Sequence, residues 1–162
     1  MTAATTYGTT IFCDDIREEI GGKKTFVGCY LDRLVAHQPF PIIVPVFALQ
    51  ITFVEPLSEA NEELLIRVFM TPDVGEELAI IDANIPADRQ QQVAQNESDP
   101  GEFLSSVMSL RASPLRLEGP GTLKVRAYRG DEEFRLGSLK IVQGEVSADV
   151  NVAEVRGRVA AP

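Results

Sequence analysis

Charged residues that could do chemistry gather in one stretch of the chain, C-D-D-I-R-E-E-I-G-G-K-K-T-F-V-G-C-Y, over Cys13–Tyr30. Carboxylates, an arginine and lysines here share a connection that ends in a Gly-Gly pair. Oxygen and nitrogen groups this dense are typical of a binding site or of a turn held by ion pairs. The candidate binding residues are Asp14, Asp15, Arg17, Glu19 and Lys23.

Three kinds of site fit these residues. In the first, Arg17 pairs with Asp14, Asp15 or Glu18 and fixes the turn. In the second, the carboxylates join other acidic loops as oxygen ligands for calcium, which takes six to eight oxygens. The acids of those other loops are Asp73, Glu76, Glu77 and Asp82. In the third, Asp14 and Asp15 form a hydrolytic carboxylate pair, although neighbours on an extended strand point to opposite faces.

Other catalytic arrangements are disfavoured. The single histidine, His37, lies in a proline-rich loop, and no nucleophile elbow or phosphate-binding glycine loop occurs. Cys13 and Cys29 fall in expected strands and are predicted to be buried free thiols. We therefore expect no catalytic residue and no cofactor, and the sequence assigns no metal.

The net negative charge limits the kinds of partner that the chain can bind. Net charge is −9 over 162 residues, which disfavours nucleic acid and anionic membranes, because both bind clustered Lys and Arg. Prolines interrupt the longest apolar run, Pro39–Val54, so it does not predict a membrane span. No signal peptide is visible, and we expect a cytoplasmic protein whose partner, if any, is another protein or a second copy.

Most of the chain alternates apolar and polar residues with a period of two. Val46–Val54 is the strongest example, with Phe47, Leu49, Ile51 and Phe53 on one face. Helix signals are limited to one turn at Ile16–Ile20 and a segment at Asp88–Gln95. The remaining strands are expected at Tyr7–Cys13, Thr25–Leu31, Leu64–Met70, Glu77–Ile85, Phe103–Leu117, Thr122–Tyr128 and Glu133–Val142.

This pattern predicts an all-β fold, an antiparallel β-sandwich of C2-like or immunoglobulin-like type. We expect about eight strands and at most one short helix. Residues 1–142 are expected to form the sandwich domain. Residues 143–162 alternate Val with polar residues and are expected to form an extra edge strand or a loosely ordered tail.

The charged block also resembles the hallmark of an uncharacterised bacterial protein family. Members carry a strand, then A-D-D-I-R-x-E-x-x-G-K and a V-G-x-Y strand. The matching residues are Asp14, Asp15, Ile16, Arg17, Glu19, Gly22, Lys23, Gly28 and Tyr30. The later G-P-G-T-L-K-V and L-G-S-L-K-I segments are similar to its C-terminal strands, whereas Cys13 replaces the usual alanine. The family has no assigned activity, so the resemblance implies a small β protein without catalytic residues.

These observations favour a non-catalytic β-sandwich that binds another protein or assembles with itself. The proline-punctuated stretch Pro39–Val46 could present Phe40, Ile42 and Ile43 at a surface. The alternatives are a calcium- or ligand-binding C2-like module using the acidic loops, and a carboxylate-dependent hydrolase.

Overall fold

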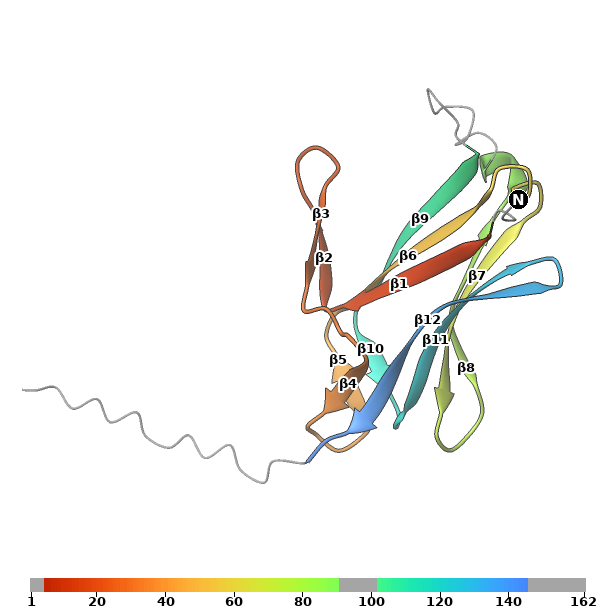
Figure 1. Ribbon diagram of the computed structural model, residues 1–162. Coiled ribbons are helices and arrows are strands. Elements are labelled where there is room, and N and C mark those ends of the chain that lie inside the picture. The colour runs from red at the N-terminus through yellow and green to blue at the C-terminus, as the bar shows by residue number, and fades with distance from the viewer. Residues whose placement is uncertain (1–4, 91–101, 146–162) are drawn as a thin grey trace, which may run out of the picture.

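The computed structural model describes residues 5–90 and 102–145, and within them the chain is all-β with one short helix (Figure 1). In these two described ranges, twelve strands form two larger sheets and two short ribbons. The first larger sheet has the order β1-β6-β9, and both of its pairings are antiparallel. Its strands are β1 (Tyr7–Cys13), β6 (Phe47–Pro56) and β9 (Phe103–Ala112).

The second larger sheet has five strands in the order β4-β12-β11-β7-β8. Three pairings are antiparallel, but β4 runs parallel to β12, so the expectation of a wholly antiparallel fold is corrected at this edge. Its strands are β4 (Arg33–Ala36), β12 (Glu132–Gln143), β11 (Gly121–Arg129), β7 (Leu64–Pro72) and β8 (Leu78–Ile85).

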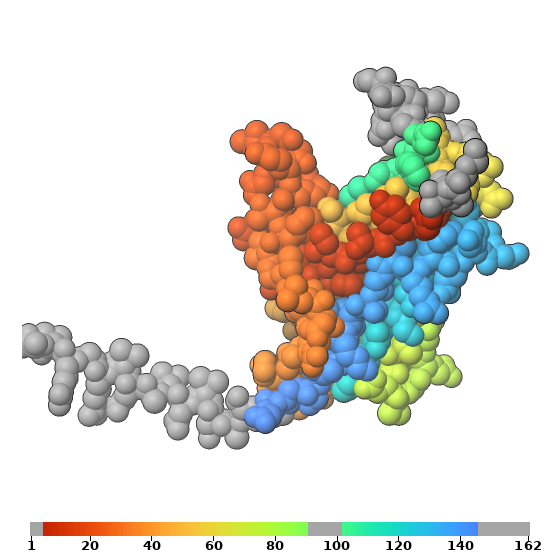
Figure 2. Space-filling view, viewed as in Figure 1, coloured from red at the N-terminus to blue at the C-terminus, as the bar shows by residue number. Residues whose placement is uncertain are grey.

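Two short antiparallel ribbons complete the fold. One pairs β2 (Asp15–Glu18) with β3 (Lys24–Val27) and projects from the body, as the orange arm in Figure 2 shows. The other pairs β5 (Ile42–Val44) with β10 (Leu115–Leu117). These ribbons and β4 raise the strand number above the expected eight, because segments this short leave little periodic signal.

The helical turn predicted at Ile16–Ile20 is wrong. Ile16 instead lies in β2, where its side chain is buried with Cys13 and Ala48, and Phe26 packs against them. Burial against the sheet therefore overrides the local capping signal, as tertiary contacts often do.

The main core draws its side chains from both larger sheets. On β6 the alternating residues predicted from the sequence, Phe47, Leu49, Ile51 and Phe53, are all at most 3% exposed. They cluster with apolar side chains of the five-stranded sheet. Those partners include Ile66, Val68, Leu123, Val125, Leu139 and Ile141. Burial of this kind contributes roughly 25 cal/mol per Å² of apolar surface and dominates folding.

Two predicted segments extend beyond what the structure describes. The helix expected at Asp88–Gln95 is seen over residues 87–90, and the rest lies outside the described residues. β12 runs through Gln143, whereas residues 146–162 of the predicted edge strand or tail also lie outside them. In the part of the chain that is described, no helix is long and apolar enough to cross a membrane.

Candidate functional site

The charged block opens with Asp14, which turns the chain from β1 into β2. Its backbone N–H donates to the carbonyls of Val27 and Gly28 at 2.9 and 3.3 Å. Its Oδ1 accepts a hydrogen bond of 2.5 Å from the Tyr30 hydroxyl. Asp14 therefore ties both ends of the β2–β3 ribbon together at its base.

Gly28 makes room for this arrangement. It has a φ of +64°, and a Cβ built there would lie 2.0 Å from Asp14 Oδ2. Only glycine combines that backbone conformation with so close an approach. Asp14, Gly28 and Tyr30, all part of the family-like motif, thus form one interlocked unit.

Asp15 holds the ribbon to the three-stranded sheet. Its Oδ1 accepts hydrogen bonds from the Ile16 N–H at 2.9 Å and from Arg111 Nη2 on β9. Arg111 Nη2 also donates to the Ile16 carbonyl at 3.1 Å. A second tether comes from Lys24, whose Nζ donates to Ser109 Oγ at 2.6 Å.

Arg17 is not the clamp that the sequence predicts. Its Nε lies 3.8 Å from Asp15 Oδ2, and its side chain is 66% exposed, so the pair is a loose surface contact. The arginine that clamps Asp15 is Arg111, which lies 96 residues along the chain. No local sequence signal points to that partner.

Glu19 and Lys23 close the far end of the ribbon through the backbone. The Glu19 N–H donates to the Lys23 carbonyl at 2.7 Å, and both residues are exposed. The structure therefore brings Asp14 and Asp15 to the base of the ribbon but leaves Arg17, Glu19 and Lys23 along its exposed length.

At the base of the ribbon, the pKa values of the Tyr30 phenol and the Cys13 thiol are both raised, which favours their neutral forms. Burial, and then the hydrogen bond to Asp14, raises the pKa of the Tyr30 phenol well above its usual range. Burial, followed by the charges of Cys29, Asp14 and Asp15, raises the pKa of the Cys13 thiol to about 11. Neither group supplies an anionic nucleophile near neutral pH.

The cysteines differ in their surroundings. Cys13 is buried and free, as predicted, and its thiol faces the Ala48 carbonyl at 3.6 Å. Cys29 is also free but exposed, so the prediction that it is buried is wrong. It directly follows Gly28, at the turn that leaves β3.

Two of the other acids considered for calcium, Asp73 and Asp82, pair with basic side chains elsewhere. Asp73 Oδ1 lies 3.1 Å from Lys140 Nζ, and Arg67 donates hydrogen bonds from Nε and Nη2 to the Asp82 carboxylate. Over residues 5–90 and 102–145, no three His, Cys, Asp or Glu residues gather as metal ligands would. The geometry gives no support for joining Asp14 with Asp73 or Asp82.

A surface groove runs from Asp14 and Tyr30 along β4 and β5. Its volume is about 510 Å³. Ile43 is 62% exposed and Val35 38% exposed, and the neighbouring Leu31 is 96% exposed. The lining residues are Asp14, Tyr30, Leu34, Val35, Ile43, Val44, Pro45 and Val46.

This groove contains the second half of Pro39–Val46, the stretch expected to present apolar side chains. Of the three residues named for that role, Ile43 is exposed, whereas Phe40 and Ile42 are half-buried and pack against the main core. The groove thus joins the interlocked Asp14–Tyr30 pair to the exposed apolar surface of β5.

A buried polar network lies at another end of the molecule and was not foreseen from the sequence. Arg129 Nη2 donates to Glu55 Oε1 at 2.5 Å and to Gln90 Oε1 at 2.9 Å. The side chains of Glu55 and Arg129 are 1% and 9% exposed. Desolvation raises the pKa of Glu55, while the Arg129 charge and hydrogen bond oppose that rise.

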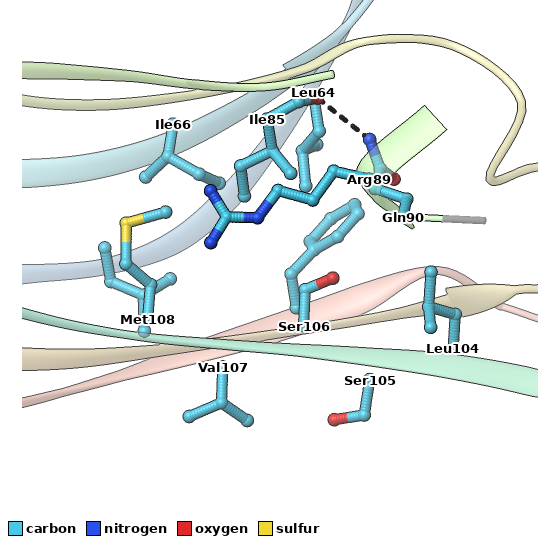
Figure 3. Close-up of a pocket in the computed structure, with 12 residues that line it drawn as sticks. Leu64, Ile66, Ile85, Arg89, Gln90, Leu104, Ser105, Ser106, Val107 and Met108 are labelled. Atoms are coloured by element: carbon cyan, nitrogen blue, oxygen red, sulfur yellow. Dashed lines mark hydrogen bonds between the residues drawn. The ribbon is translucent and has the colours of Figure 1, made fainter. Parts of the chain in front are cut away.

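The same network positions the short helix. Gln90 Nε2 donates to the carbonyls of Glu62 and Ile85 at 3.2 and 3.0 Å. Beside it lies an apolar cleft of about 520 Å³ between β9 and the strands β7 and β8 (Figure 3). This cleft contains none of the charged residues singled out from the sequence.

Comparison with known proteins agrees with the resemblance drawn from the charged block. No curated protein and no solved structure matches the chain. A model described as a family of unknown function (DUF6941) matches residues 9–142, which include the ribbon, the groove and nearly all of both larger sheets. The chain therefore belongs to this family of unknown function, DUF6941.

Proposed function

We propose that this protein is a non-catalytic β-sandwich module, C2-like or immunoglobulin-like, that binds a partner protein in the groove beside Asp14 and Tyr30. The exposed Ile43 side chain in that groove is the observation that carries the proposal. Exposed apolar side chains grouped in a concave surface are typical of protein-binding sites.

The groove suggests what kind of partner it takes. Val35, Ile43, Val44 and Val46 offer apolar contact, and the Asp14 carboxylate provides a negative group at one end. With a net charge of −9, the chain attracts basic partners and repels acidic ones. The partner is a protein segment that presents apolar side chains next to a lysine or arginine.

The interlocked motif has a supporting role in this proposal. Asp14, Gly28 and Tyr30 fix the base of the ribbon, and this base forms one end of the groove. The protonated Tyr30 and Cys13 favour a binding role over catalysis. Both cysteines are free, which suits the reducing cytoplasm in which we place the protein.

Affinity capture with matched variants tests the proposal. Ile43→Asp puts a charge in the groove, and Val74→Asp puts the same charge at another exposed valine, 93% exposed and outside the groove. We expect a partner that is retained by the native chain and by the Val74→Asp variant and lost from the Ile43→Asp variant. A partner retained equally by all three proteins would refute binding in the groove.

A further inference from the structure

Among the described residues, strand β9 is an edge strand of the three-stranded sheet. It pairs with β6 along all ten residues, Phe103–Ala112, and is the last strand in the β1-β6-β9 order. Within the described residues, its other side has no strand partner. Its sequence, F-L-S-S-V-M-S-L-R-A, has a single charge, Arg111, and that residue clamps Asp15. Long, uncharged edge strands are ready templates for pairing with another strand.

The apolar cleft lies directly beside this edge. Its walls include the buried side chains of Ile51, Phe53, Leu64 and Ile66. Met108 on β9 also lines it, and in Figure 3 its side chain lies toward the cleft whereas that of Val107 points away. A strand added to β9 would therefore direct every second side chain into the cleft.

The Arg89 side chain must move before a strand can bind at the cleft. In Figure 3 the Arg89 side chain extends across the cleft between Ile66 and Met108. Arg89 is exposed, and its backbone N–H donates to Asp88 Oδ1 at 2.8 Å. Its long side chain can turn toward solvent to admit the strand.

Residues 146–162 contain a sequence suited to this position. Valine or alanine occupies every second place from Val146 to Val152, and the places between are polar. We propose that this segment of a second copy of the chain pairs with the β9 edge and places its apolar residues in the cleft. The apolar residues are Val146, Ala148, Val150 and Val152, and the intervening ones are Ser147, Asp149 and Asn151.

The geometry favours a second copy over the same chain. The described chain ends beside β4, where the Gly144 N–H donates to the Ala36 carbonyl at 2.8 Å. The cleft lies at the opposite edge of that sheet, three strand spacings from β12. Crossing those spacings and moving to the other sheet covers roughly 25 Å, or about seven residues. If the segment came from the same chain, Val146–Val152 would be taken up in reaching the cleft and could not itself pair with β9.

The test is the mass of the full-length protein in solution, measured by light scattering over a series of concentrations. Val150→Asp with Val152→Asp charges the apolar face, and Ser147→Asp with Asn151→Asp adds the same charge to the opposite face. All four positions lie outside the described fold, and circular dichroism checks that each variant folds. The native chain and the control pair are expected to associate, and the Val150→Asp/Val152→Asp variant to be at least tenfold weaker in association.

Amide exchange locates the contact. Protection of the β9 amides should fall at low concentration and in the Val150→Asp/Val152→Asp variant, but not in the control pair. A native chain that stays a single copy at every concentration overturns the inference, as does association that both variant pairs leave unchanged. Ile43→Asp should leave the association intact, so this contact and binding in the groove are tested separately.

Discussion

The Tyr30 hydroxyl donates a hydrogen bond of 2.5 Å to Asp14 Oδ1 across the base of the β2–β3 ribbon. The Tyr30 backbone N–H donates to the Phe12 carbonyl at 2.8 Å, which fixes the same residue to β1. Two points of attachment thus hold the chain where it enters and leaves the ribbon. Through Asp14 and Tyr30, the charged block has a structural role and shapes one end of the groove.

Tyr30→Phe removes the donor to Asp14 and keeps the aromatic contact with Phe47, whose ring centroid lies 5.9 Å away. A hydrogen bond to a charged acceptor that is partly exposed contributes about 1–1.5 kcal/mol. We expect the free energy of unfolding in urea to fall by that amount. Tyr7→Phe is the control, because Tyr7 is 58% exposed at the start of β1. An equal loss in both variants would contradict the role given to the Asp14 bond.

Gly28→Ala should cost more stability than Gly22→Ala. Both glycines have positive φ, +64° and +75°, so each substitution introduces backbone strain of roughly 1–2 kcal/mol. Only at Gly28 does the new Cβ also collide with the Asp14 carboxylate, whereas nothing lies within 4 Å at Gly22. Thermal unfolding of the two variants measures the difference. Equal melting temperatures would show that a side chain at position 28 does not disturb the Asp14 carboxylate.

Arg129→Met should destabilise the protein in a pH-dependent way. It leaves Glu55 buried without its cation, and breaking a buried pair by removing one partner costs about 3–5 kcal/mol near neutral pH. Without Arg129 the pKa of Glu55 rises further, because the cation had been lowering it. The folded variant then holds more protons than the unfolded chain, so its stability falls as pH rises above the ordinary glutamate pKa.

The deficit of Arg129→Met relative to the native chain should therefore be smaller near pH 5 than near pH 8. Urea unfolding at both values measures it. Arg116→Met is the control, because Arg116 and Glu118 form an exposed pair and its loss should leave stability nearly unchanged. A deficit that does not vary with pH would contradict the raised pKa of Glu55.

The two thiols should differ in reactivity. Cys29 is exposed, whereas Cys13 is buried with a pKa of about 11. At pH 8 the folded protein should release one equivalent from a thiol-reactive disulfide reagent, and Cys29→Ser should abolish that fast phase. Cys13 should react only after unfolding. A fast phase that survives in Cys29→Ser would show that the Cys13 thiol is accessible and ionised.

Period-two alternation predicted the longest strands correctly. Phe47, Leu49, Ile51 and Phe53 line the core side of β6, and Leu123 and Val125 do the same on β11. Strands this long bury a whole face, and burial forces the alternation that the sequence displays. The all-β class follows from these elements.

The contacts that define the site could not be read from the sequence. Arg111 reaches Asp15 across 96 residues, and Arg129 reaches Glu55 across 74. Such pairs depend on which strands become neighbours, and charge alone does not specify this. Arg17 was the natural candidate to clamp Asp15 because it lies two residues away, yet the side chain that reaches Asp15 from the sheet is Arg111.

Amide exchange of the protein with its captured partner tests the groove as a binding site most directly. Binding in the groove predicts that the amides of β5 and of Val46 gain protection, while those of β8, at the far edge of the five-stranded sheet, are unchanged. Unchanged exchange along β5 and Val46 in the presence of saturating partner, with protection appearing elsewhere, would contradict the proposed function.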